Sequence, residues 1–284
     1  MRPSKFEYYR PTTVAEAVKI LTANSGAKAL AGGHSLIPAM NLRLSQPEAI
    51  VDLGRLDDLK KISVSGKTLT IGAMCTHAQI AASADVQKHC PALAAAASRI
   101  GDPQVRNWGT LGGNLAHADP ASDPPTVVLA CNATIQTQGP AGARSIGVDD
   151  FFVDLFTTAL QAGELITAVS IPSLQGMRSA YAKMPHPASR FAVVGVAVAL
   201  DMNGSQCKQA RVAVGGAIPK ATRSPGAEKA LTGATINDAT LDSAANALMQ
   251  GIKGSVMSDI YAPEDYRQAM VGVYFKRSVK AALA

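Results

Sequence analysis

The first 56 residues alternate between helix-like and strand-like hydrophobic patterns. Apolar residues recur every three or four positions over residues 14–21, and Thr13 stands where an N-cap is expected, so this pattern predicts a helix. Short, mostly apolar runs at 27–31 and 49–53 predict two buried strands, which we expect to pair in parallel across an αβ unit. Residues 1–56 are therefore expected to form a small α/β lobe.

Residues 57–175 carry a different pattern, which predicts a second lobe. The alternating sequence of residues 62–71 surrounds a central glycine turn and predicts a β-hairpin. The alanine-rich residues 91–100 predict a helix, and later strand-like runs end with residues 165–171. The composition becomes loop-like after Pro172, where we place the end of this lobe.

The last part, residues 176–284, has the pattern of a sheet followed by helices. We expect strands at 179–184, 191–200 and 211–217, and helices at 227–231, 238–249 and 264–283. The expected fold class is α+β, with two α/β lobes followed by a C-terminal domain that holds an antiparallel sheet and a helical bundle.

Two glycine-rich stretches interrupt these patterns. They are Leu30-Ala31-Gly32-Gly33-His34-Ser35-Leu36 and Thr110-Leu111-Gly112-Gly113-Asn114. Each is expected to be a turn after a strand-like run, in which glycine permits a positive φ and free N–H groups can contact an anion. Two such turns predict a ligand with two linked phosphates, such as a dinucleotide, and Pro38 indicates a short helix after the first turn.

The glycine pairs also allow a simpler interpretation. Either pair alone is equally typical of an ordinary tight turn. Neither pair matches G-x-G-x-x-G or G-x-x-x-x-G-K-S/T, which argues against a Rossmann or P-loop site. Residues 118–125, which follow the second pair, hold three prolines and two aspartates and predict a loop.

Composition constrains the partners and the location. The net charge is +6, but lysine and arginine are scattered without a basic run, which argues against nucleic-acid binding. No secretory signal precedes Phe6, and the longest apolar run, 191–200, is half a membrane span, so we expect a cytoplasmic protein with no membrane span. The four cysteines are widely spaced and no nucleophile–base cluster can be assembled, so we expect no metal site and no catalytic side chain.

The two glycine motifs, the first read on as far as Pro38, resemble the FAD-diphosphate loops of the medium, flavin-carrying subunit of molybdenum hydroxylases. This family includes aerobic carbon monoxide dehydrogenase and xanthine dehydrogenase, and the likeness runs from Phe6 to the C-terminal helix. The resemblance implies a PCMH-type FAD-binding fold in the first two lobes and a C-terminal flavoprotein domain. It also implies that FAD is the cofactor on this chain.

The resemblance further implies which residues contact FAD. They are Leu30, Ala31, Gly32, Gly33, His34, Ser35, Leu36, Ile100, Gly101, Thr110, Gly112, Gly113, Asn114, His117, Asp123, Ile166 and Lys183, of which Ile100, Gly101 and Ile166 wall the flavin ring. His34 is implied as a non-covalent contact or a brace of its loop, and His117 as a neighbour of the diphosphate or the ribityl chain. Asp123 would accept hydrogen bonds from cofactor sugar hydroxyls, and Lys183 would lie beside the pyrimidine ring and raise its potential.

The residues themselves equally allow structural roles. Asp123 can be a solvated loop carboxylate, Lys183 a surface charge at a strand end, and His117 a structural residue. The apolar wall residues can simply belong to the core, and that role is compatible with contact to a flavin.

The resemblance also implies partner chains. A large subunit with a molybdenum–pterin cofactor would oxidise the substrate, and a small subunit would hold two iron–sulfur (2Fe–2S) clusters, in a dimer of heterotrimers. Electrons would reach FAD singly and leave in pairs to an external acceptor such as a quinone, NAD or dioxygen. The sequence does not choose the substrate of the complex among carbon monoxide, aldehydes, purines and N-heterocycles, because the resemblance implies that selectivity lies on the molybdenum chain.

The sequence also allows two alternative functions. Gly32-Gly33-His34 also resembles the motif of vanillyl-alcohol-oxidase-like enzymes that bond FAD covalently to histidine, which would make this chain a self-contained oxidase with FAD on His34. The roughly 110 residues after Pro172 leave little room for the substrate-capping domain of such an oxidase. The second alternative is a binding or assembly module without enzymatic activity.

Overall fold

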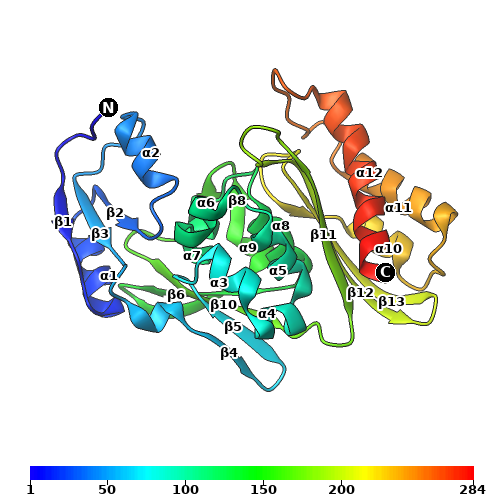
Figure 1. The fold of residues 1–284 in the computed structure, drawn as a ribbon, viewed down its shortest axis with the longest axis horizontal. Coiled ribbons are helices and arrows are strands. Elements are labelled where there is room, and N and C mark those ends of the chain that lie inside the picture. Colours follow the sequence, from blue (N-terminus) through cyan, green and yellow to red (C-terminus); the bar gives the residue numbers. More distant parts are fainter.

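The computed structural model describes all 284 residues, which build three larger sheets and one two-stranded sheet (Figure 1). The N-terminal part is a three-stranded parallel sheet with two helices and strand order β1-β3-β2. Its elements are β1 (Glu7–Tyr9), α1 (Val14–Ala23), β2 (Ala27–Leu30), α2 (Leu36–Asn41) and β3 (Ala49–Asp52). The predicted parallel pairing is confirmed, because Ala27 lies opposite Ala49 and Leu30 opposite Asp52. The pattern did not reveal β1, whose three residues are too few to show a period.

The middle part is a five-stranded antiparallel sheet with strand order β4-β5-β10-β6-β7. Its strands are β4 (Ile62–Ser65), β5 (Thr68–Gly72), β6 (Thr134–Gly139), β7 (Gly142–Gly147) and β10 (Leu165–Pro172), with η1 (Asp57–Lys60) before them and α9 (Val148–Phe151), β8 (Phe152–Asp154) and β9 (Thr157–Thr158) as connections. The helices of this part are α3 (His77–Ala82), α4 (Ala84–His89), α5 (Pro91–Ser98), α6 (Pro103–Trp108), α7 (Leu111–His117) and α8 (Asp123–Ala130). These helices lie on one face of the sheet (Figure 1), and a core of 35 buried residues fills the layer between.

The C-terminal part is a four-stranded antiparallel sheet with three helices. Its elements are β11 (Arg178–Pro185), β12 (Ala192–Asn203), β13 (Gln206–Gly215), β14 (Thr222–Arg223), α10 (Pro225–Leu231), α11 (Asp238–Gly251) and α12 (Glu264–Leu283). The three helices cover one face of this sheet, and α5 and α8 of the middle part pack against the other face. The predicted strands and helices of this part, and the α+β fold class, are confirmed.

Burial on both faces explains the long apolar run of β12. Val196 and Val198 face the helices of the C-terminal part, whereas Ala197 and Ala199 face the core of the middle part. Side chains of a strand point alternately to its two faces, so a strand covered on both sides needs apolar residues throughout. The β11–β14 sheet is therefore shared between the two parts.

Two predictions about the middle part are wrong. The second glycine stretch is not a turn after a strand, because α6 precedes it and residues 111–117 form α7. Residues 118–125 are not all loop, because α8 begins at Asp123. Pro124 and Pro125 lie in the first turn of α8, where a backbone N–H has no partner inside the helix, so prolines are tolerated there.

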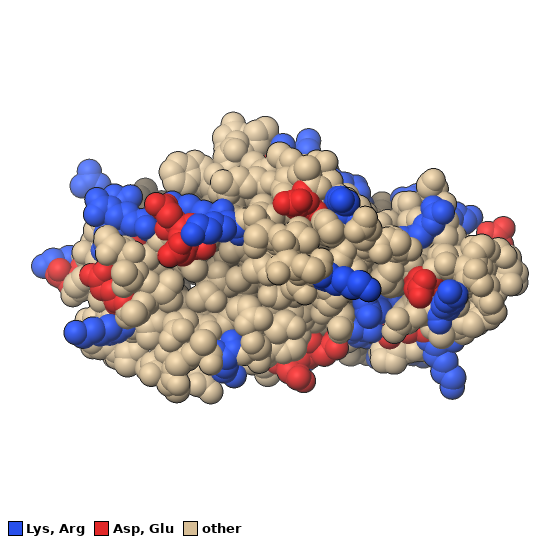
Figure 2. All heavy atoms as spheres, turned by 90° about the horizontal axis from the view of Figure 1, so that it is seen from below, with Lys and Arg blue, Asp and Glu red and all other residues tan.

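The surface adds two observations. None of the helices combines the length and the apolar character that a membrane span requires. On the face seen in Figure 2, acidic and basic side chains are interspersed, so the net charge of +6 is not gathered into one patch on that face.

Candidate functional site

The first glycine motif leaves β2 as a loop with unpaired donors. Gly33 has φ +76°, a conformation that disfavours any residue with a Cβ. None of the N–H groups of residues 32–36 has an acceptor within the chain, whereas the N–H of Ile37 donates to the Gly33 carbonyl. Successive free N–H groups in such a loop suit an anion or another strong acceptor.

The two glycine motifs lie against each other. A Cβ at Gly32 would overlap the carbonyl oxygen of Trp108, the last residue of α6, so only glycine allows the first loop to rest there. A Cβ at Gly113 would lie 3.3 Å from the Cβ of Ala31. The fold therefore joins stretches that are far apart in the sequence into one surface.

The N–H groups of the second motif are mostly occupied, which corrects the prediction that both glycine pairs present free amides. The N–H of Leu111 donates to the Cys75 carbonyl at 3.0 Å, and that of Gly112 donates to the Ala73 carbonyl at 2.8 Å. The N–H of Gly113 donates to Thr110 Oγ1 at 3.2 Å. A Cβ at Gly112 would lie 2.5 Å from that of Ala73, so this glycine serves close packing of α7 rather than a positive φ.

The second motif still offers polar atoms. The Thr110 N–H has no acceptor within the chain. Asn114 donates from Nδ2 to Ser122 Oγ at 2.7 Å, and its buried Oδ1 has no partner. His117 is exposed at the end of α7, with its ring centroid 5.1 Å from that of Phe156.

Asp123 and Lys183, 60 residues apart in the chain, form a buried ion pair. Lys183 Nζ lies 2.8 Å from Asp123 Oδ2, and the two side chains are 1% and 5% exposed. Lys183 also donates to the main-chain carbonyls of Arg99 at 3.0 Å and Arg190 at 2.9 Å. The three ammonium protons are thus matched by three acceptors within the chain. The structure therefore corrects both surface interpretations, the solvated loop carboxylate and the strand-end surface charge.

Tyr181 completes this cluster. Its hydroxyl donates to Asp123 Oδ1 at 2.5 Å, so both carboxylate oxygens are engaged by protein groups. Burial raises the pKa of Asp123, and the hydrogen bonds from Lys183 and Tyr181 oppose that rise. Burial and the neighbouring carboxylate raise the pKa of Tyr181 well above its usual value, so its hydroxyl stays a donor.

The predicted wall residues lie in two settings. Ile166 is 5% exposed and belongs to the core of the middle part. Ile100 and Gly101 are half-buried in the turn between α5 and α6, next to Arg99, whose carbonyl Lys183 holds. The exposed His34 places Nδ1 3.0 Å from the Gly32 carbonyl, which braces its own loop.

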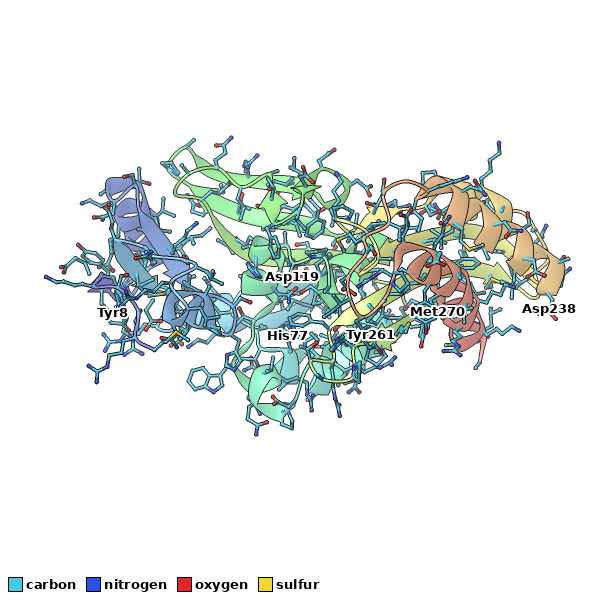
Figure 3. The ribbon with its side chains drawn as sticks, turned by 90° about the horizontal axis from the view of Figure 1, so that it is seen from above. Tyr8, His77, Asp119, Asp238, Tyr261 and Met270 are labelled. Atoms are coloured by element: carbon cyan, nitrogen blue, oxygen red, sulfur yellow. The ribbon has the colours of Figure 1, made fainter.

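His77 also lies in this region. Its position after a helix N-cap predicts a surface or cap residue, and that prediction is wrong because the side chain is buried. Thr76 forms a capping box with Gln79 at the start of α3. His77 beside it, labelled in Figure 3, is only 3% exposed, and its Nδ1 is buried without a partner. A Cβ at Gly109 would lie 2.9 Å from the His77 ring, which therefore packs under the segment that supports Gly32. Burial first, and then the charge of His34, lower the pKa of His77 to about 4, so it is neutral at pH 7. No local signal separates such a histidine from an exposed cap residue.

Known families match almost the whole chain. Residues 4–174 match the FAD binding domain in molybdopterin dehydrogenase, and residues 179–282 match the CO dehydrogenase flavoprotein C-terminal domain. The chain is 37% identical over 286 residues to the carbon monoxide dehydrogenase medium chain of Hydrogenophaga pseudoflava, covering 100% of this chain and 99% of the relative. It is also 37% identical to the nicotine 6-hydroxylase medium subunit of Paenarthrobacter nicotinovorans, covering 98% of each.

Solved structures give the same relationship. Carbon monoxide dehydrogenase from Hydrogenophaga pseudoflava contains a chain that superposes with a TM-score of 0.96 at 38% identity, covering 100% of this chain and 99% of that one. Quinoline 2-oxidoreductase from Pseudomonas putida 86 superposes with a TM-score of 0.93 at 32% identity, covering 100% and 99%.

Proposed function

Because this chain belongs to the FAD-binding medium subunits of molybdenum hydroxylases, we propose that it links iron–sulfur clusters of a partner subunit to an external electron acceptor. The chain is an FAD-dependent oxidoreductase subunit. In the proposed complex, a small subunit holds the 2Fe–2S clusters and a large subunit holds the molybdenum–pterin cofactor. When bound, FAD supplies the chemistry that combines electrons arriving singly into pairs for the acceptor.

The observation that carries this proposal is the row of unpaired N–H groups at residues 32–36, beside the second glycine motif. These donors fit an anionic diphosphate, because they form no hydrogen bonds within the chain. The Thr110 N–H and the Asn114 side chain fit further polar groups of the same cofactor. We assign the diphosphate to the first loop, with the second motif as its neighbour.

Asp123 and Lys183 have a different proposed role. Their polar atoms are matched within the chain, so they hold the segments around the site rather than donate to a ligand directly. The ion pair is neutral as a whole, but its two separated charges still contribute to the electrostatic potential at a flavin ring bound nearby. His117, exposed at the end of α7, is proposed to line the cofactor arm.

The chain's own part in the reaction is to bind, orient and shield. We assign no general base or nucleophile to it, because substrate oxidation is proposed to take place on the molybdenum subunit. The relatives described above take their names from carbon monoxide, nicotine and quinoline, although they resemble this chain along its whole length. We therefore assign the choice of substrate to the large subunit.

The covalent oxidase alternative is not favoured. Relatives that match the chain from end to end are medium subunits of molybdenum hydroxylases. His34 also holds its Nδ1 against the carbonyl of its own loop. Acid precipitation separates the two alternatives, because non-covalent flavin stays in the supernatant and covalent flavin stays with the polypeptide.

Affinity purification of the tagged full chain from its native host tests the proposal. We expect a yellow preparation with one acid-extractable FAD per chain, two further polypeptides, and molybdenum and iron in that complex. A colourless chain that takes up no FAD, or a flavoprotein with no companion polypeptide or metal, would contradict the proposed function.

A further inference from the structure

The turn between α5 and α6 has an unusual hydrogen-bonding arrangement, in which cations hold three successive carbonyls. Lys183 Nζ donates to the Arg99 carbonyl at 3.0 Å. Arg106 Nη1 donates to the Ile100 carbonyl at 2.9 Å and to the Gly101 carbonyl at 3.1 Å. The main chain of this turn is thus oriented by a lysine from β11 on one side and an arginine from α6 on the other.

This arrangement determines where the N–H groups of the turn point. In a trans peptide the N–H points opposite to the carbonyl of the preceding residue, and the chain has no cis peptide bond. Because the carbonyls of Ile100 and Gly101 face Arg106, the N–H groups of Gly101 and Asp102 point away from it. Neither N–H has an acceptor within the chain.

Glycine is needed for this geometry at position 101. Its φ is +41°, and a Cβ there would lie only 3.0 Å from the Cβ of Val105. The positive φ lets both carbonyls reach one guanidinium nitrogen, so two neighbouring N–H groups are left pointing to the opposite side.

The turn belongs to the same region as the first glycine motif. Both are joined to α6, which begins just after the turn and ends at Trp108, where Gly32 rests. A six-residue helix is about 9 Å long, so residues 101–102 and the contact of Gly32 with Trp108 lie at opposite ends of a helix of roughly that length. A ligand with an anionic group and an acceptor-bearing ring has the extent to contact both.

We propose that Arg106, with Lys183 beside it, is a positioning residue that aims the N–H groups of Gly101 and Asp102 at the hydrogen-bond-accepting edge of the flavin ring. This inference rests on the proposed function, since it takes FAD as the ligand. Arg106 forms no ion pair within the chain and adds positive potential behind the turn, whereas the charge of Lys183 is balanced by Asp123. Positive potential favours the more electron-rich, reduced state of a ring bound in front of the turn. Arg106 itself touches neither cofactor nor substrate.

Variants of Arg106 test this role on the full chain, purified with any partner proteins that accompany it. Arg106→Met removes the donors and the charge while keeping much of the aliphatic length, and Arg106→Lys restores a charge. The matched control is Arg178→Met, because Arg178 Nη1 also donates to a main-chain carbonyl, that of Leu283, in the C-terminal part. We measure FAD affinity by fluorescence titration, the flavin reduction potential by dye equilibration, and the unfolding temperature.

We expect Arg106→Met to bind FAD at least roughly tenfold more weakly and to shift the flavin potential to a more negative value. Arg106→Lys should recover most of that potential, and Arg178→Met should leave affinity and potential unchanged. Wild-type affinity and potential in Arg106→Met would overturn the inference. So would a loss of affinity that only follows a lowered unfolding temperature while the potential stays unchanged. A wild-type chain that binds no FAD would show, before any variant is compared, that the proposed function itself has failed.

Discussion

At the scale of single residues, the glycines of the two motifs do different work. Gly33 adopts a positive φ, whereas Gly32 and Gly112 allow main chain to approach main chain or a neighbouring side chain. These two roles predict different losses of stability when each glycine is replaced. Strain from a positive φ is moderate, but a Cβ that overlaps a carbonyl oxygen requires the two loops to separate.

Gly33→Ala is expected to lose FAD and about 1–2 kcal/mol of unfolding free energy, since its φ of +76° strains any residue with a Cβ. Gly66→Ala is the matched control, because Gly66 has φ +56° in the β4–β5 hairpin and an added Cβ there meets nothing within 4 Å. Urea unfolding and flavin absorbance measure the two effects. Both variants should lose stability, and only Gly33→Ala should lose flavin. Stoichiometric FAD in Gly33→Ala would refute the loop assignment.

The buried pair of Asp123 and Lys183 predicts strong energetic coupling. Lys183→Met leaves a carboxylate buried without its cation, which is expected to cost about 3–5 kcal/mol. Adding Asp123→Asn removes the charge that was left alone, so the double variant should be more stable than the sum of the single effects predicts. Chemical denaturation of the four proteins in this cycle gives the coupling. Additive effects would show that the pair contributes nothing as a pair.

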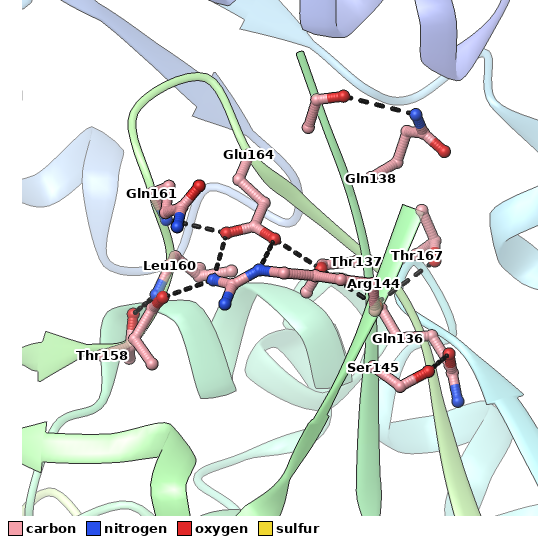
Figure 4. A network of polar contacts seen from close by, with 12 residues as sticks. Gln136, Thr137, Gln138, Arg144, Ser145, Thr158, Leu160, Gln161, Glu164 and Thr167 are labelled. Atoms are coloured by element: carbon pink, nitrogen blue, oxygen red, sulfur yellow. Dashed lines mark hydrogen bonds and ion pairs between the residues drawn. The ribbon is translucent and has the colours of Figure 1, made fainter. Parts of the chain in front are cut away.

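At the scale of elements, one polar network joins β7 to the turn before β10 (Figure 4). Arg144 Nε donates to Glu164 Oε1 at 2.6 Å, and its Nη2 donates to Oε2 at 2.7 Å. Thr137 and the Gln161 N–H donate to the same carboxylate. These four donors hold the pKa of Glu164 down to about 2, with the Arg144 hydrogen bonds as the largest cause.

This network predicts a pH window for stability. The folded pKa of Glu164, about 2, lies below its ordinary value of 4.5, so its contribution is complete above pH 4.5 and is lost as the pH falls towards 2. The full contribution corresponds to about 3 kcal/mol. Glu164→Gln should be less stable than wild type at pH 7, and the gap should narrow below pH 4.5. A gap that stays constant from pH 7 to pH 2.5, measured by urea unfolding, would contradict this assignment.

At the scale of the whole molecule, the C-terminal sheet belongs to two cores. Its outer face packs on α10, α11 and α12, and its inner face packs on α5 and α8. The loop after α7 also ties to this sheet, because the Ala192 N–H donates to the Ala121 carbonyl at 3.0 Å. The domain boundary that the sequence places near residue 176 stays a prediction. Because the two parts share one sheet, we expect each to need the other for stable folding.

A fragment of residues 176–284 tests this dependence. Without the middle part it would expose Tyr181, Ala197 and Ala199, all buried against the core of the middle part. We expect the fragment to aggregate or to unfold without cooperativity, since an uncovered apolar sheet face favours association. Size-exclusion chromatography and thermal unfolding are the measurements. A monomer with a cooperative transition would indicate an independent domain.

Much of this protein is readable from local sequence. Periodicity and capping residues were enough to predict α1, the three C-terminal helices and the buried strand β12, because the pattern of each element depends on residues only a few positions apart. The glycine motifs were enough to identify the family. The unpaired donors of residues 32–36 also follow from a local property, the glycine turn at the end of β2.

Only the tertiary structure decided which polar groups are still free. The second motif has a glycine pair like the first. However, the N–H groups of Leu111 and Gly112 donate to the carbonyls of Cys75 and Ala73, which belong to another segment of the chain. In the same way Lys183 meets Asp123 across 60 residues. Local patterns specify the backbone and the apolar faces, but a hydrogen bond depends on which distant partner the packed chain brings within reach. The sequence alone therefore determined the kind of protein and the loop that we propose binds FAD. The packing of the chain determined which hydrogen-bond donors and which charges have no partner within it.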